Sequence, residues 1–594
     1  MAQDKEKHGH LPRWKSIKLQ AQTTLLTVFD KILGTSKGGS RKYNKEQATV
    51  IVGPVIGKVT NTIARILIET DRNASVTVSV SEQPKNAIGL SRTQSGGLTS
   101  PGRKSGPLVD EPSPRSKEKK NGTKHGRKHA KLSKGVVGMR PTVFEFTGLA
   151  PGTRYEVQLK GCISPVASSF STFPEEPSDV TNVAVISCNK IFITQQAIPI
   201  HSDLWAHLAK NIESGKVDLV LHLGDQIYGD GDKMIDAEAG SDRDRWSDRF
   251  RLAKDMLNNV PKEQWQDHRD EICEKYREVY RETWQHLPTA KCLANCPNLM
   301  IYDDHEVRDN WGDLTEDWEA DSLDFFIARC AWVVNLEYQR QLHENVDFLK
   351  LDHINKDYHF HVVGGVGLLF LDIRGSRTFH RKKLDEKPYL GSSQWNDITS
   401  SLKPNGLFDK VRVLLVCSPA PLVFLEPTIT NAAAKRVHQL EDFKGHWSAS
   451  MHIKEQVEMI NCLWTWKNST TNREVLVLGG DVHCGGHSEI LCQNKILFRQ
   501  LTTSAIANMP LPKSAYYFMR AAGRIGHLNA AYTFRHHDWT RSRNYGMLQI
   551  KNHREEETKD VEITAQLVKG KFMLGIQMGV KVSYLPTEKT PTCC

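Results

Sequence analysis

The sequence predicts an α/β domain that follows a smaller all-β domain, and three patterns lead to this prediction. Three short apolar runs end abruptly in polar residues: Val217–Leu223, Leu299–Tyr302 and Glu474–Leu478. Runs of this length are typical of strands that are covered on both faces, as in α/β proteins. Segments with helical periodicity lie between them, at about 203–214, 276–284 and 322–344. Upstream of all of these, alternating apolar and polar residues favour strands without helices.

Acidic residues and histidines follow each apolar run. Asp225 follows the first run, Asp303-Asp304-His305-Glu306 the second, and Asp481 and His483 the third. If the three strands share one carboxyl edge of a sheet, Asp225, Asp304, Asp481 and His483 form a cage there. Carboxylates with imidazole suit Mn, Fe, Zn or Ca, and the negative charges would repel one another without a cation. A single Gly-Asp end is ordinary turn chemistry and Asp-Asp-His-Glu can cap a helix, but three such ends together favour a metal site.

The motifs around these residues resemble the PhoD-like (alkaline phosphatase D) branch of the calcineurin-like metallophosphatases. The resemblance extends from about residue 180 to about 550 and rests on six segments: LHLGDQIYGDGD, IYDDHEVRDNWGD, LDIRGSRT, YLGSSQW, CSPAPLVF and LVLGGDVH. It implies a four-layer αββα sandwich around a site for two or more metal ions. It also implies hydrolysis of phosphomonoesters or phosphodiesters by a hydroxide held between two cations that Asp225 bridges.

Two further ligands are implied by the resemblance. Many metallophosphatases end their first strand in Asp-x-His, whereas this branch has Ser-Cys, which Ser187 and Cys188 match. A thiolate from Cys188 favours iron in one site, with Ca, Mn or Zn in the other. The family also places a ligating tyrosine near the helical segment 276–284, where Tyr280 is the candidate. Without the family, Cys188 is an inert core thiol and Tyr280 a packing residue.

Three residues are candidates for the chemistry itself. His305 follows the ligand Asp304 and would give a proton to the leaving alkoxide. Arg308 and Asn310 offer a guanidinium fork and an amide to phosphate oxygens. Arg308 would alternatively pair with one of the many neighbouring carboxylates.

The segment before the α/β domain predicts a fibronectin III-like β-sandwich at about 47–175. Residues 64–69 and 75–80 alternate around Asp71-Arg72-Asn73, a hairpin signature. The pattern Leu149, Pro151, Gly152, Thr153, Tyr155 resembles a corner at which a tyrosine hydroxyl bonds to the backbone. Residues 83–134 are rich in Ser, Gly, Pro, Lys and Arg and predict a disordered basic insertion, either a solvated loop or a polyanion contact.

The remaining segments predict domain limits and location. The metallophosphatase domain is expected at 180–555, between a basic segment at 1–46 and an extension at 556–594. The chain has no 18-residue apolar run and no signal-peptide pattern, which predicts a cytoplasmic protein. Residues 12–33 predict an amphipathic helix that either lies on an anionic membrane or packs on its own domain. The terminal Cys593 and Cys594 resemble lipidation sites, or are free thiols.

Two rival functions stay open from the sequence. One is a non-catalytic, membrane-associated scaffold with a structural metal site. The other is a nucleic-acid phosphodiesterase, which the net charge of +10 suggests, although much of that charge lies in the amino-terminal third.

Overall fold

The computed structural model describes residues 47–83, 130–176, 178–191, 203–231, 248–348, 356–378, 385–434, 445–552, 561–573 and 576–584. The chain divides into two units at Gln47, and everything below concerns the second unit, residues 48–594. The predicted helix at 12–33, most of the predicted insertion at 83–134, and Cys593 and Cys594 lie outside the described residues.

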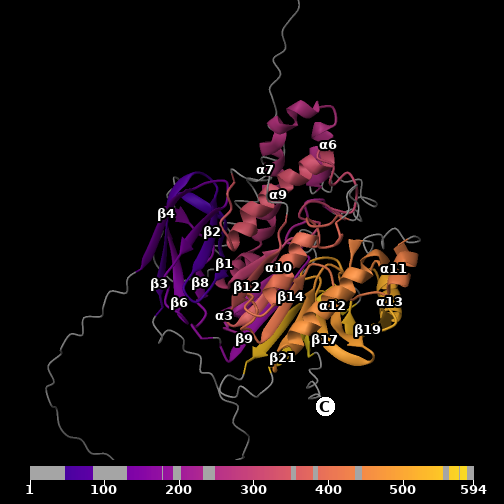
Figure 1. Cartoon of the computed structure of the whole chain (residues 1–594). Helices are drawn as coiled ribbons and strands as arrows, with labels where there is room; N and C mark the ends of the chain where they lie inside the picture. The colour runs from indigo at the N-terminus through magenta and orange to yellow at the C-terminus, as the bar shows by residue number, and fades with distance from the viewer. Residues whose placement is uncertain are drawn as a thin grey trace, which may run out of the picture. The chain divides into compact units, whose positions relative to one another are not determined.

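The first described part is a β-sandwich of two four-stranded sheets, drawn in indigo and purple in Figure 1. One sheet has the order β5-β2-β1-β7, with β1 Ala48–Val59, β2 Ala64–Thr70, β5 Thr142–Phe146 and β7 Cys162–Ile163. The other has the order β4-β3-β6-β8, with β3 Ala74–Glu82, β4 Lys131–Val137, β6 Arg154–Lys160 and β8 Ser168–Ser171. Their apolar faces share one core, which includes Ile66, Val78 and Phe144. Burial of these alternating residues explains the period-two pattern in the sequence.

Two expectations for this sandwich are wrong. The predicted hairpin does not form, because β2 pairs with β1 and β5 whereas β3 pairs with β4 and β6 in the opposite sheet. The turn at Asp71–Asn73 therefore carries the chain from one sheet to the other. The predicted insertion is also too long, since β4 begins at Lys131 and runs antiparallel to β3. Lys131 and Lys134 suit an exposed edge strand, because lysines there discourage further pairing.

The predicted tyrosine corner is present. The backbone N–H of Ala150 donates a hydrogen bond to the hydroxyl of Tyr155 over 2.8 Å.

The larger part contains a six-stranded and an eight-stranded sheet. The first has the order β11-β10-β9-β20-β21-β22, with β9 Val180–Ile186, β10 Leu219–Leu223, β11 Asn298–Ile301, β20 Asn544–Lys551, β21 Glu562–Met573 and β22 Ile576–Tyr584. Strands β9, β10 and β11 run parallel, so their carboxyl ends lie at one edge. The predicted 556–594 extension is therefore structured in part, because β21 and β22 continue this sheet.

The eight-stranded sheet has the order β12-β13-β14-β15-β17-β16-β19-β18. Its strands are β12 His359–Val363, β13 Val366–Phe370, β14 Val413–Ser418, β15 Glu474–Gly479, β16 Gly485–Cys492, β17 Lys495–Thr502, β18 Ile525–His527 and β19 Tyr532–Thr540. Strands β13, β14, β15 and β17 are parallel. The two sheets pack face to face through Val185, Leu221, Leu368, Leu415 and their neighbours, which are all buried.

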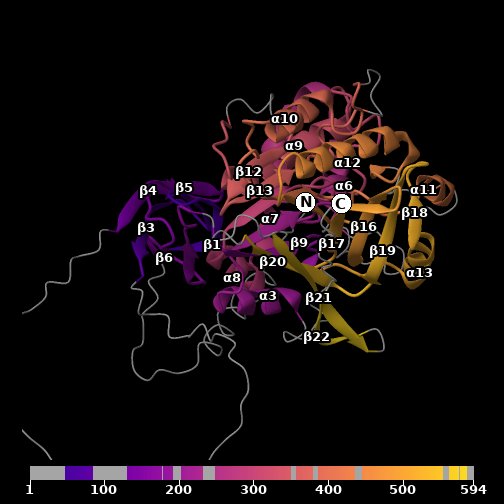
Figure 2. The same cartoon turned by 60° about the horizontal axis from the view of Figure 1, so that its bottom comes forward.

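Helices cover the outer faces of both sheets, as Figures 1 and 2 show. On the six-stranded sheet, α3 Leu204–Glu213 and α8 Leu287–Asn295 pack against Ala184, Ile186 and Val220. On the eight-stranded sheet, α10 Ser392–Leu402 and α12 Ile453–Asn468 pack against Leu414, Val416 and Val477. A four-layer αββα arrangement results, as the resemblance implied.

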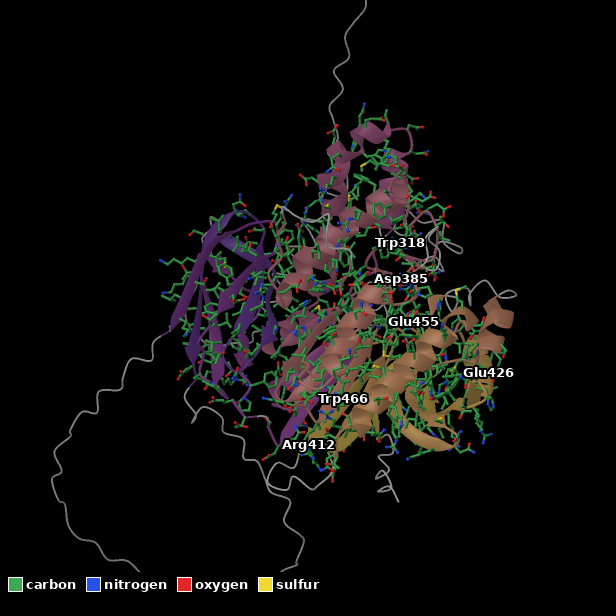
Figure 3. All side chains as sticks on the ribbon, in the orientation of Figure 1. Trp318, Asp385, Arg412, Glu426, Glu455 and Trp466 are labelled. Carbon is green, nitrogen blue, oxygen red and sulfur yellow. The ribbon has the colours of Figure 1, made fainter. Side chains whose placement is uncertain are left out.

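The other helices flank this sandwich. They are α6 Arg249–Leu257, α7 Arg269–Trp284, α9 Leu323–Tyr338, α11 Pro427–Ala434 and α13 Lys513–Ala522, with 3-10 turns η3 Lys262–His268, η4 Arg340–Leu342 and η7 Ser450–His452. Glu455 of α12, labelled in Figure 3, accepts the backbone N–H groups of Tyr389 and Leu390 and the indole N–H of Trp395. None of the helices among the described residues is long and apolar enough to cross a membrane.

Candidate metal centre

Polar side chains from four strand ends lie together where the two sheets meet. Cys188 follows β9, Asp225 follows β10, and Asp303 and Asp304 follow β11, all in the six-stranded sheet. Asp481 and His483 follow β15, which belongs to the eight-stranded sheet. The prediction of one shared sheet edge was therefore wrong, because the cage forms between the edges of two sheets.

The backbone at this place is strained. Cys188, Asp225, Asp481 and His483 have positive φ angles of 56°, 56°, 64° and 48°. Such conformations are uncommon for residues other than glycine and concentrate at functional sites. They show that the surrounding fold fixes the direction of each side chain at a cost in local energy.

The carboxylate of Glu306 holds two of the strand ends together. It accepts the backbone N–H groups of Asp225, Gln226 and Asp303 over 3.2, 2.7 and 2.9 Å. The side chain of Gln339 donates a further hydrogen bond to it over 2.9 Å. Because β10 and β11 end in these backbone groups, Glu306 fixes the position of both candidate ligand loops.

One candidate ligand group contains sulfur, nitrogen and oxygen. Potential ligand atoms of Cys188, Asp225 and His483 lie within 4.8 Å of one another. The hydroxyl of Tyr228 donates to Asp225 Oδ2 over 3.0 Å and lies 3.4 Å from His483 Nε2. Burial and the neighbouring Asp225 raise the pKa of Cys188 and Tyr228 well above their ordinary values. A cation between these groups would offset that penalty, because it favours thiolate and phenolate.

The second candidate group contains carboxylates only. Oxygens of Asp225, Asp303, Asp304 and Asp481 lie within 4.8 Å of one another. Asp225 Oδ1 and Asp303 Oδ2 are buried without a hydrogen-bond partner in the described structure. Burial raises the pKa of Asp225 well above its ordinary value and that of Asp303 to about 7. Clustered acids with unpaired buried oxygens fit a divalent or trivalent cation.

Two basic groups already offset part of this negative charge. Arg374 bonds to Asp303 and lies 3.2 Å from Asp304 Oδ1. His446 Nε2 lies 2.7 Å from Asp481 Oδ2. Burial lowers the pKa of His446, but Asp481 outweighs this effect and raises it.

His305 lies beside the carboxylates, and an acid orients its ring. Its Nδ1–H donates to Asp230 Oδ1 over 2.8 Å, and its ring lies 4.1 Å from that of Tyr228. Its ligand-type nitrogen also lies within 4.8 Å of Asp225 and Asp304 oxygens. Burial lowers the pKa of His305, but Asp230, Asp304 and Asp225 outweigh burial and raise it well above its ordinary value. The raised pKa favours the protonated form of this ring.

Arg308 pairs with a carboxylate, and Asn310 contacts the cage through its backbone. The guanidinium of Arg308 donates hydrogen bonds to the carboxylate of the buried Asp317 and to the carbonyl of Asp309. Arg308 therefore pairs with a carboxylate, which was the second of its two expected roles. The backbone N–H of Asn310 donates to Asp304 Oδ2 over 2.6 Å. Asn310 thereby orients a candidate ligand through its backbone.

Tyr280 is not near the cage. It is buried in the helical core, where its hydroxyl contacts Asn335 and Gln339 and its ring stacks on Tyr338 at 4.3 Å. Tyr228, three residues after Asp225, contacts the cage instead. The signal was present in the motif LHLGDQIYGD, because a tyrosine in that loop must stay close to the strand end.

Other residues of the centre were missed for physical reasons. Arg374 lies in the segment LDIRGSRT, whose pattern by itself indicates no role for this arginine. His446 and Asn508, whose amide nitrogen lies 3.1 Å from His483 Nε2, reach the centre from distant loops. No spacing in the sequence indicates them.

A two-sheet sandwich with carboxylate, imidazole and thiol groups at its strand ends is the arrangement expected of the metallophosphatases. Residues 183–335 match the model of the PhoD-like phosphatase family. The matched stretch, a PhoD-like phosphatase domain by this comparison, includes the candidate ligands Cys188, Asp225, Asp303 and Asp304.

Comparisons with whole chains agree with this fold. The structure of PhoD superimposes with a TM-score of 0.56 at 15% identity, covering 91% of this chain and 90% of that one. This likeness shows a shared fold. An uncharacterized protein of Saccharomyces cerevisiae is 21% identical over 463 residues, which are 64% of each chain. The chain thus spans somewhat less than two thirds of that relative.

Proposed function

We propose that the chain is a metal-dependent phosphoesterase with a two-cation centre. Cys188, Asp225, Tyr228 and His483 would hold one cation, and Asp225, Asp303, Asp304 and Asp481 the other. The observation that carries this proposal is the position of Asp225, which belongs to both groups and has a buried, unpaired Oδ1. One carboxylate that serves two groups is suited to bridge two ions.

The donor sets favour different ions. A soft thiolate together with a hard, anionic phenolate oxygen suits iron, whereas a set of carboxylates suits Ca or Mn, with Zn also compatible. When bound, such a pair of cations polarises phosphate oxygens and lowers the pKa of a bound water toward neutrality.

The residues of the chain supply proton transfer and charge balance. Asp230 orients His305 and favours its protonated form, so the ring can give a proton to the departing ester oxygen. Arg374 and His446 neutralise part of the acidic cage and hold Asp303, Asp304 and Asp481 in position. Asn310 stays a proposed amide donor to phosphate, next to the Asp304 that its backbone orients.

Location and lipid attachment stay predictions. A cytoplasmic protein attached to an anionic membrane through residues 12–33 and Cys593 and Cys594 would co-sediment with acidic vesicles. Truncation before residue 47 and Cys593→Ser with Cys594→Ser would each weaken that association.

The substrate class is tested with two model esters. The purified chain is dialysed against a chelator, resupplied with Fe, Ca, Mn or Zn, and assayed with p-nitrophenyl phosphate and bis-p-nitrophenyl phosphate. Turnover that chelation abolishes and metal restores is the expected result, and the preferred ester identifies a mono- or diesterase. Metal binding without turnover of either ester under any supplement would favour the scaffold function.

A further inference from the structure

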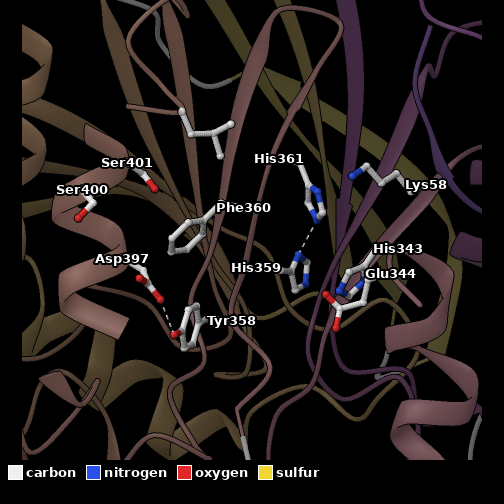
Figure 4. Close-up of a pocket in the computed structure, with 11 residues that line it drawn as sticks. Lys58, His343, Glu344, Tyr358, His359, Phe360, His361, Asp397, Ser400 and Ser401 are labelled. Atoms are coloured by element: carbon white, nitrogen blue, oxygen red, sulfur yellow. Dashed lines mark hydrogen bonds between the residues drawn. The ribbon is translucent and has the colours of Figure 1, made fainter. Parts of the chain in front are cut away.

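Three buried histidines form a second cluster away from the candidate metal centre. His343 follows η4, and His359 and His361 lie on β12. Only 5%, 7% and 6% of their surfaces are exposed. They line a cavity of about 620 Å³ together with Lys58, Glu344 and Tyr358, as Figure 4 shows. No residue of this cluster belongs to either ligand group of the candidate metal centre.

The nitrogens of the cluster point toward one another. One ring nitrogen from each histidine lies within 4.8 Å of the others. The ring centroids are 4.0 Å apart for His343 and His359, 4.9 Å for His359 and His361, and 5.5 Å for His343 and His361. Four ligands in a tetrahedral zinc site with bonds of about 2.0–2.1 Å are roughly 3.3 Å apart. Small rotations of the rings therefore suffice to place three nitrogens around one ion.

The backbone fixes the tautomer of His359. Its Nε2 lies 2.9 Å from the carbonyl of Met300, which only accepts, so Nε2 carries the hydrogen. The lone pair of Nδ1 then faces His361 Nε2 over 2.8 Å. A metal-binding imidazole is commonly oriented in this way, through a hydrogen bond from its other nitrogen to a backbone carbonyl.

His343 has no such partner. Both of its ring nitrogens are buried and lack a hydrogen bond within the described part of the chain. An unpaired polar group costs about 1–3 kcal/mol when it is buried, so the ring of His343 needs a compensating interaction. Burial lowers the pKa of His343 and His359 well below the ordinary value and that of His361 to about 3, so the rings are neutral. Neutral imidazoles are the form that binds metal.

We propose that His343, His359 and His361 bind one zinc-class transition-metal ion, separate from the candidate metal centre. Nitrogen-only ligands favour Zn, Cu, Ni or Co over Ca and Mg. The cavity that the three histidines line would leave room for a fourth ligand to the ion. The ion would link β11, β12 and the end of α9, because Met300 orients His359 and His343 follows η4.

The positive charge of Lys58 would repel a cation bound by the three histidines. Its side chain lines the same cavity. Burial and Arg65 lower the pKa of Lys58, while Glu344 and Glu145 act in the opposite direction. Lys58→Met removes the competing charge and should tighten binding roughly tenfold.

The test uses Asp225→Asn as background, so that the candidate metal centre does not contribute. Four full-length chains are dialysed against Co²⁺ or Zn²⁺. They are Asp225→Asn itself and Asp225→Asn combined with His343→Gln and His361→Gln, with Lys58→Met, or with Tyr358→Phe. Tyr358→Phe, which removes a hydroxyl in the same cavity, is the matched control. We expect about one ion per chain in Asp225→Asn and in the control, none in the histidine variant, and tighter binding with Lys58→Met. Equal stoichiometry in all four chains would overturn the proposal.

A spectroscopic measurement covers the case in which the histidine variant fails to fold. X-ray absorption of Zn²⁺ bound to Asp225→Asn should show a shell with three imidazoles. A shell of oxygens alone would contradict the proposal. Neither readout uses phosphatase activity, so failure here is distinct from failure of the proposed function.

Discussion

The hydroxyl of Tyr228 donates a hydrogen bond to Asp225 Oδ2 over 3.0 Å, within one loop that follows β10. Its ring also contacts that of His305 at 4.1 Å. Tyr228 thus touches both a candidate ligand and the candidate proton donor. Tyr280, the tyrosine that the family resemblance suggested, touches neither.

This difference predicts opposite results for two tyrosine variants. Tyr228→Phe should lower both the metal content and the turnover of p-nitrophenyl phosphate, because it removes an anionic oxygen donor from one site. Tyr280→Phe should keep metal and turnover and lose only about 1 kcal/mol of stability, from hydrogen bonds to Asn335 and Gln339. Elemental analysis and thermal melts check both variants. Loss of metal from Tyr280→Phe alone would reverse the assignment.

The role of His305 predicts a dependence on the leaving group. His305→Gln should slow hydrolysis of an alkyl phosphate by about 10²–10⁴-fold, because that alkoxide needs a proton as it departs. Turnover of p-nitrophenyl phosphate should fall far less, since p-nitrophenolate is stable without a proton. Asp230→Asn should show the same pattern in weaker form, because it removes the acceptor that orients the ring. Equal losses for both esters would exclude His305 as the proton donor.

A buried ion pair joins the β-sandwich to the helices of the larger part. Glu69 of β2 is fully buried. Its carboxylate accepts hydrogen bonds from the guanidinium of Arg281 of α7 over 2.7 Å and from the hydroxyl of Tyr338 over 2.5 Å. Glu69→Gln should destabilise the chain by about 2–4 kcal/mol, because Arg281 loses its buried partner. Arg72→Ala, which breaks an exposed pair with Asp71, should cost less than about 1 kcal/mol. Denaturant unfolding measures both, and similar losses would show that the buried pair does not stabilise the contact.

His487 predicts part of the acid sensitivity of the fold. Its ring is 3% exposed, both nitrogens lack hydrogen bonds in the described structure, and burial with Arg499 nearby lowers its pKa to about 3. The unfolded chain binds the proton near pH 6.5, so it holds more protons between pH 6.5 and 3, and stability falls as the pH falls.

Removing this group should flatten the pH profile. Between pH 7 and pH 5, His487→Phe should lose about 2 kcal/mol less unfolding free energy than the wild type. His527→Gln, at an exposed ring, should follow the wild type. Parallel curves for His487→Phe and the wild type would show that His487 does not contribute.

Local patterns predicted much of this structure. The apolar runs before Asp225, Asp304 and Asp481 are strands, and the helical periodicity at about 203–214 is α3. These features depend on residues close in sequence, where periodicity and capping chemistry decide the conformation.

Features that depend on distant residues were not predictable. The strands β2 and β3 would show the same alternating pattern whether they paired with each other or lay in opposite sheets. The packing of the two sheets on one core places them in opposite sheets. The three-histidine cluster joins His343 to β12 across a loop, and His446 meets Asp481 from another loop. Only the fold brings these side chains together.

The central claim is that Asp225 bridges two metal ions that a phosphoesterase needs. The most direct test measures metal content and turnover of p-nitrophenyl phosphate and bis-p-nitrophenyl phosphate together, for the wild type and Asp225→Asn. We predict about two ions per chain at the centre of the wild type, iron among them, and loss of these two ions and of the turnover in Asp225→Asn. Full metal content and unchanged turnover in Asp225→Asn would contradict the account.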